Sequence, residues 1–151
     1  MIDFANIEKY KENNRIEAKK SLGGLPKSLW ETYSAFANAD GGVILLGVGE
    51  REDHSFRVLE LLDPEELLEE FWAILRNPDF VSVNLLTEEH VQILRDEGKC
   101  IVAIFVPEAS PSQKPVHLLR DPWRHSYRRV GEADMRCSTE EVEEMLRQRS
   151  K

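Results

Sequence analysis

The order of apolar and polar residues predicts a helix that turns sharply into a buried strand in the first third of the chain. Apolar side chains recur at helical spacing over residues 29–37. Gly41-Gly42 is typical of a helix end. The continuous apolar run 43–48 predicts a strand that is covered on both faces. We therefore expect a structural corner here, in which Asn38 satisfies nearby backbone groups.

The segments on either side of this corner alternate between helical and extended patterns. Phe4, Ile7 and Tyr10 are helically spaced, whereas residues 15–19 are expected to be extended. A further helix should begin at residues 63–66, which combine a capping aspartate, a first-position proline and first-turn acids.

The C-terminal half predicts hairpins and a last helix. The apolar segments 81–86 and 90–94 are followed by Asp96-Glu97-Gly98-Lys99, which predicts a hairpin connection to a strand at 100–106. Another strand is expected at 126–130, and residues 138–141 form a capping box that opens a terminal helix. Helices mixed with hairpins in this order predict an α+β fold.

Length, composition and charge narrow the class of protein. The 151 residues suit one domain, 1–151. No apolar run approaches the roughly 20 residues of a membrane span, and the charged N-terminus lacks a signal-peptide core, so we expect a cytoplasmic protein. Cys100 and Cys137 are far apart, which argues against a disulfide framework or a zinc site. The formal net charge of -8 opposes bulk attraction to nucleic acid but leaves room for a local basic face.

Acidic residues near the corner form the first candidate site. If residues 15–19 pair beside the strand at 43–48, Glu17 and Glu50 can approach each other, and Glu12 flanks Glu17. Clustered carboxylates can hold Mg²⁺ or Mn²⁺, and such a metal could activate water against a phosphodiester. Lys19 completes an acid-x-lysine pattern that is seen in many nucleases. The alternative is a set of solvated surface acids, since the chain has 28 Asp and Glu.

A basic segment, residues 111–130, forms the second candidate site. Its five cations are Lys114, Arg120, Arg124, Arg128 and Arg129, and the rings between them are His117, Trp123, His125 and Tyr127. Cations can contact phosphates and rings can stack on bases. A smaller basic group near the N-terminus consists of Arg15, Lys19, Lys20 and Lys27. The alternative is a solvated loop and strand whose arginines are paired with the surplus carboxylates.

A nucleotide-binding loop has little support in this sequence. The glycines of such a loop lead from a strand into a helix, with the phosphate at the helix N-terminus, whereas here the order is helix to strand. Gly47-Val48-Gly49 also lacks the later glycine of the GxGxxG motif.

Three segments together resemble the Schlafen AlbA-like domain family, often labelled as DNA-binding. They are Glu17-Ala18-Lys19, the run Ala35-Phe36-Ala37-Asn38 to Gly47-Val48, and Tyr127-Arg128-Arg129-Val130-Gly131. The resemblance spans roughly residues 4–146 and implies a mixed, mainly antiparallel sheet flanked by helices. Two positions depart from the family pattern. Ala18 stands where an aromatic residue is usual, and Gly49-Glu50 stands where aspartates are usual.

The resemblance implies one leading function and two alternatives. The leading hypothesis is a nucleic-acid-binding domain of the transcriptional-regulator type. Its contacts to DNA or RNA would come from Arg15, Lys20, Lys114, Arg124, Arg128 and Arg129. The first alternative is a metal-dependent ribonuclease with Glu12, Glu17, Glu50 and Lys19 as catalytic residues, because the three glutamates resemble the Mg²⁺ or Mn²⁺ set of nuclease-active Schlafen proteins.

The second alternative is a protein-interaction or assembly domain, which the net charge favours. Related proteins carry two such domains side by side, so a homodimer is also expected. The chain would stand alone or form the N-terminal part of a longer protein.

Overall fold

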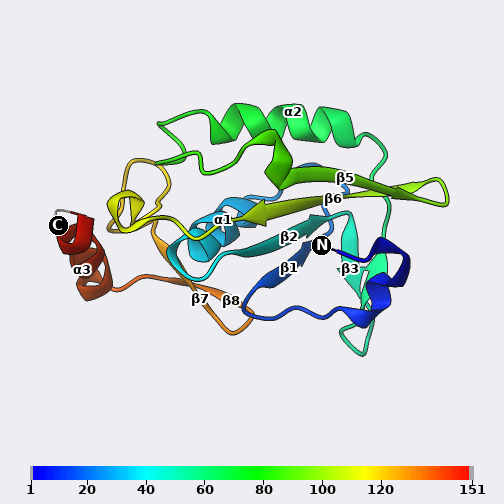
Figure 1. The fold of residues 1–151 in the computed structure, drawn as a ribbon, viewed down its shortest axis with the longest axis horizontal. Coiled ribbons are helices and arrows are strands. Elements are labelled where there is room, and N and C mark those ends of the chain that lie inside the picture. Colours follow the sequence, from blue (N-terminus) through cyan, green and yellow to red (C-terminus); the bar gives the residue numbers. More distant parts are fainter. Residues whose placement is uncertain (1, 150–151) are drawn as a thin grey trace.

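The computed structural model describes residues 2–149 and has an α+β fold built on a four-stranded sheet (Figure 1). The strand order is β1-β2-β6-β5. The strands are β1 (Ile16–Lys19), β2 (Gly42–Leu46), β6 (Lys99–Val106) and β5 (Val91–Asp96). β1 runs parallel to β2, and the other neighbours are antiparallel. This arrangement confirms the expected mixed, mainly antiparallel sheet.

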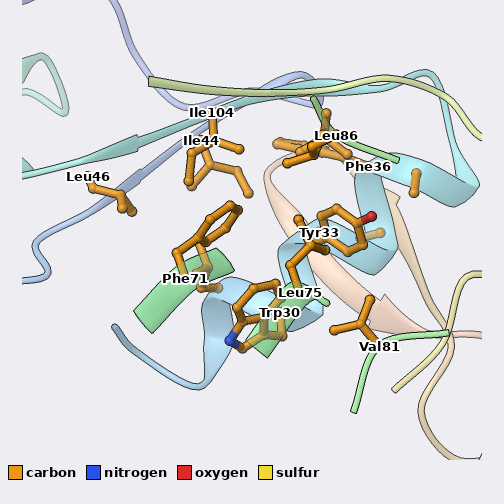
Figure 2. Packing of buried hydrophobic residues seen from close by; sticks show 14 of the residues in the cluster. Trp30, Tyr33, Phe36, Ile44, Leu46, Phe71, Leu75, Val81, Leu86 and Ile104 are labelled. Atoms are coloured by element: carbon orange, nitrogen blue, oxygen red, sulfur yellow. The ribbon is translucent and has the colours of Figure 1, made fainter. Parts of the chain in front are cut away.

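One face of the sheet is covered by the helices α1 (Ser28–Asn38) and α2 (Pro64–Leu75). Figure 2 shows Ile44, Leu46 and Ile104 of the sheet facing the rings of both helices. Trp30 of α1 stacks on Phe71 of α2 with ring centroids 5.2 Å apart. Helix α2 begins as its sequence predicts, because Asp63 Oδ1 accepts a hydrogen bond from the Glu66 N–H at 3.0 Å.

The opposite face of the sheet is covered by the N-terminal 3₁₀ helix η1 (Phe4–Lys9) and by the hairpin of β3 (Val48–Glu50) and β4 (Phe56–Val58). Leu45 points to this second face and is fully buried, as Ile44 is on the first. The strand over 43–48 is therefore covered on both faces, as expected, but its continuity was predicted wrongly. Gly47 has a φ of +85°, ends β2 and sends β3 into a separate two-stranded sheet.

The C-terminal part forms a second hairpin, β7 (Tyr127–Val130) and β8 (Ala133–Arg136), followed by helix α3 (Thr139–Arg149). The capping box is present, since Ser138 Oγ accepts from the Glu141 N–H at 3.1 Å and Glu141 Oε1 accepts from the Ser138 N–H at 2.7 Å. Strand β8 had no counterpart in the sequence pattern. The apolar segment 81–86 is irregular apart from a single bridge between Val81 and Leu118.

Short 3₁₀ helices occur at η2 (Glu88–His90) and η3 (Pro111–Gln113). Cys100 and Cys137 are both buried free thiols. Within residues 2–149 no helix is both long enough and apolar enough to cross a membrane.

The corner between α1 and β2 is held by the side chain of Asn38. Its Nδ2 donates to the carbonyl oxygens of Val116 and Tyr127 at 3.0 and 2.9 Å, and its Oδ1 accepts from the Val116 N–H at 2.7 Å. The expected role of Asn38 in satisfying backbone groups is confirmed. Gly41 lies against β6, where a Cβ would be 2.7 Å from the Val106 carbonyl oxygen. The corner therefore joins α1, β2 and β7 in one packed unit.

Candidate functional site

The free edge of β1 carries the acid-x-lysine pattern. Glu17 and Lys19 are in register with Ile44 and Leu46 of β2, so their side chains lie on the face that α1 covers. Glu17 is 9% exposed. Lys19 Nζ lies 4.0 Å from Glu17 Oε2 and donates to Ser28 Oγ, at the start of α1, at 3.0 Å. Both groups are therefore held by the sheet and the helix.

The structure brings Glu12, Glu17 and Glu50 together. Glu12 Oε2 accepts a hydrogen bond from the Ala18 N–H at 2.9 Å, which places this carboxyl against the edge of β1. The carboxyl groups of Glu17 and Glu50 also lie near the Glu12 carboxyl and act on its pKa. Burial, together with these neighbouring carboxyl groups, raises the pKa of Glu12 to about 9. Glu12 therefore carries a proton at neutral pH and can donate it in a hydrogen bond to a neighbouring glutamate.

The pKa of Glu50 is shifted in the opposite direction, below its usual value. The hydrogen bond of Glu50 with His54, with Nδ1 3.0 Å from Oε2, and the nearby Glu12 carboxyl hold this pKa down. Of the three carboxyl groups, Glu12 is thus protonated, Glu17 bonds to Arg129 and Glu50 bonds to His54.

A divalent cation does not fit these carboxyl groups as they are arranged. Carboxylate oxygens are suitable ligands for Mg²⁺ or Mn²⁺. However, within residues 2–149 no group of three or more His, Cys, Asp or Glu side chains is positioned to hold a metal ion. Glu17 Oε1 is already taken by Arg129 Nη1 at 2.7 Å.

Arg129 occupies the centre of the site. Its side chain is only 1% exposed, and Nη1 lies 2.7 Å from both Glu17 Oε1 and Asp134 Oδ1. Nη2 donates to the carbonyl oxygens of Asn13 and Ile16 at 2.9 and 3.3 Å. Its guanidinium carbon lies 4.9 Å from the centroid of the Phe36 ring. Burial opposes the charge, but the hydrogen bonds to Asp134 and Glu17 outweigh it and raise the pKa of Arg129.

This position corrects the expected role of Arg129 as a nucleic-acid contact, because its side chain is buried and both Nη1 and Nη2 already bond to protein oxygens. Tyr127 is also buried, at 8% exposure, and its ring is not free to stack on a base.

The other cations of the basic segment are charge-compensated. The ion pairs are Lys114 with Glu108, Arg120 with Asp79, Arg124 with Asp121 and Arg128 with Glu141. The pairing with surplus carboxylates that the sequence left open is thus found throughout residues 111–130. Surface pairs of this kind contribute little to stability, so a phosphate could exchange for the carboxylate. The expected contacts of Lys114, Arg124 and Arg128 stay predictions.

The N-terminal cations have a different environment. Arg15 and Lys20 flank β1 at its two ends, and Lys27 precedes α1. All three are exposed, and in the described part of the chain none of them lies within 4.0 Å of a carboxylate oxygen. These side chains are available to an external anion.

Sequence reasoning missed Asp134, Phe36 and Thr32 as members of the site. Asp134 lies opposite Arg129 in the β7–β8 register and also accepts from Thr32 Oγ1 at 2.5 Å. A hairpin signal around Gly131 would have placed Asp134 across from Arg129. No pattern in the neighbouring sequence indicated the contacts of Asp134 with Thr32 and of Arg129 with Phe36.

Replacing Glu12 with glutamine should make the protein more stable at alkaline pH. A folded pKa of about 9 lies above the usual 4.5, so the folded state keeps a proton that the unfolded state releases. Wild-type stability is then greatest below pH 4.5 and falls as the pH rises towards 9. A carboxamide resembles the protonated carboxyl but needs no proton. We expect a gain in unfolding free energy of roughly 1–2 kcal/mol at about pH 8, after allowing for solvent screening.

Urea unfolding at about pH 5 and about pH 8 measures this difference. The exposed neighbour Glu52→Gln is the matched control and should change little at either pH. An equal effect of Glu12→Gln at both pH values would contradict the protonated state of Glu12.

Comparison with known proteins gives one family and two related structures. The family model described as "Schlafen, AlbA_2" matches residues 12–138. The N-terminal domain of the "Putative ATP-dependent DNA Helicase RecG-related Protein" from Nitrosomonas europaea is 29% identical, with a TM-score of 0.55 over 82% of this chain and 81% of that domain. The DIP2311 protein from Corynebacterium diphtheriae is 20% identical and shares the fold, with a TM-score of 0.55 over 89% of this chain but only 24% of that one. A comparison with curated proteins gave no match.

Proposed function

Since this chain belongs to the Schlafen AlbA_2 family, we propose that it is a nucleic-acid-binding domain that contacts phosphates through cations flanking β1. The observation that carries the proposal is the exposure of Arg15 and Lys20 without carboxylate partners in the described residues, beside a basic segment that is internally neutralised. The similarity to a domain of a protein described as a DNA helicase supports the same class of ligand.

The spacing of the two cations suits a nucleic-acid backbone. The four extended residues of β1 lie between Arg15 and Lys20 and place their Cα atoms roughly 16 Å apart. This corresponds to roughly five nucleotides along one strand of a duplex. Phosphate contacts of this kind position a protein without reading sequence, so the proposal covers both DNA and RNA. The role as a transcriptional regulator, the cytoplasmic location and the homodimer belong to the same proposal, and a monomeric mass in solution would count against the dimer.

The double variant Arg15→Ala/Lys20→Ala should bind nucleic acid about tenfold more weakly at low salt, because two phosphate contacts are lost. Fluorescence anisotropy with labelled single-stranded and duplex DNA and RNA gives the affinities. Lys99→Ala, an exposed cation on the tip of the β5–β6 hairpin, is the matched control and should bind as the wild type does. Equal affinity of the double variant and Lys99→Ala would exclude this surface.

A metal-dependent ribonuclease is the second candidate, and one observation favours it. Glu17 and Glu50 lie near enough to Glu12 to shift its pKa, which supports this candidate. Their arrangement does not form a cation site in the described residues, so binding without cleavage is the better supported function. RNA incubated with the chain and Mn²⁺ decides between them. Cleavage that is lost in Glu50→Gln would establish the nuclease, and intact RNA would eliminate it.

A further inference from the structure

A hollow of about 560 Å³ lies between the β1–α1 loop, the β4–α2 loop and the first turns of α2. Leu22 rises from the first loop and Leu62 from the second. The floor is closed by Leu61 and Leu67, which are buried. We call this hollow the leucine groove. It shares no residue with the Glu17–Arg129 site.

The two rim leucines are unusually exposed for large apolar side chains. Leu62 is 95% exposed and Leu22 is 61% exposed. Leu62 is not carried on a loose loop. The neighbouring Leu61 N–H donates to the Cys100 carbonyl at 3.0 Å, and the Leu59 N–H donates to the Gly47 carbonyl at 2.8 Å. The backbone therefore holds the apolar side chain of Leu62 out into solvent at the rim of the groove.

The charged side chains around the leucine groove all have one sign. They are Glu60, Asp63, Glu66 and Glu70, and no Lys or Arg within residues 2–149 lines it. Glu66 and Glu70 are four residues apart on α2, an arrangement in which like charges repel along the helix. A cation that lies between them would relieve this repulsion.

A polar group in the leucine groove also lacks a partner. Ser21 Oγ is shielded from solvent, and no hydrogen bond to it is found in the described residues. A buried hydroxyl without a partner costs free energy. The leucine groove thus offers apolar contact and negative charge at one place.

We propose that the leucine groove docks a segment of a partner protein in which apolar side chains are flanked by lysine or arginine. The apolar side chains cover Leu22 and Leu62, and the cations face the four carboxylates. The same carboxylates repel phosphates, so the groove itself does not suit a nucleic-acid backbone.

The probe for this proposal is a short amphipathic peptide with leucines at helical spacing and lysines elsewhere. Amide chemical shifts of the full chain show where it binds, and anisotropy of the labelled peptide gives the affinity. We expect shifts gathered at residues 59–70 and about tenfold weaker binding to Leu62→Ser. Leu119→Ser, an exposed leucine outside the groove at 51% exposure, should bind the peptide as the wild type does.

A control peptide and a double variant test whether binding depends on the opposite charges of the peptide and the groove. A peptide with glutamate in place of lysine should not bind, and Glu66→Gln/Glu70→Gln should weaken binding of the lysine peptide. Absence of binding by the wild type, equal binding by Leu62→Ser and Leu119→Ser, or shifts spread over other acidic surfaces would each overturn the proposal.

Discussion

Replacing Arg129 with alanine should lower the free energy of unfolding by about 3–5 kcal/mol, because it leaves Glu17 and Asp134 buried together without their cation. The same change removes the contact with the Phe36 ring and the bonds to two carbonyl groups at the edge of β1. It also removes the ion pair that ties the β7–β8 hairpin to β1. Urea unfolding followed by tryptophan fluorescence measures the loss.

Arg128→Ala is the matched control on the same strand. Arg128 is half-exposed and pairs with Glu141 at 3.0 Å, so its removal should cost no more than about 1 kcal/mol. If the two variants were equally stable, Arg129 would not be the residue that fastens the hairpin.

Asn38→Ala should be the second most damaging substitution, with a loss of about 2–3 kcal/mol. The Val116 N–H and the Tyr127 carbonyl lose their partner in the interior, and the truncated side chain cannot replace it. Thermal unfolding of the variant should show a clearly lower midpoint.

The exposed neighbour Asp40→Ala tests whether the loss comes from the side-chain bonds or from the corner itself. It should stay within about 0.5 kcal/mol of the wild type. If both variants lost a similar amount of unfolding free energy, the loss in Asn38→Ala could not be assigned to the hydrogen bonds of its side chain.

Features encoded by neighbouring residues could be predicted from the sequence. The start of α2 depends on Asp63 and Pro64, and the β5–β6 hairpin on Glu97 and Gly98, which adopt φ values of +50° and +78°. Each signal lies within four residues of the structure that it determines. The corner at Asn38 was predictable for the same reason.

Features that depend on distant contacts could not be predicted in this way. The break at Gly47 is invisible in an apolar run, because it arises where Leu61 packs within 2.7 Å of the position a Cβ would take. Arg129 is a cation in the sequence, but its partner Glu17 is 112 residues away. Whether a cation meets a carboxylate or is left for a phosphate is decided by the fold.

Because the fold decides which cations are paired, the expected nucleic-acid surface moves from residues 111–130 to the cations that flank β1. The segment with the most arginines is neutralised by its own carboxylates, whereas the sparser N-terminal cations stay available. Binding through Arg15 and Lys20 is compatible with a net charge of -8, since only the local potential acts on a phosphate at contact distance.

The salt dependence of binding tests this account most directly. The logarithm of the association constant for a labelled DNA or RNA should fall linearly with the logarithm of the salt concentration, and the slope should be smaller by about two in Arg15→Ala/Lys20→Ala. A wild-type chain that binds no nucleic acid at low salt, or a double variant with an unchanged slope, would contradict it.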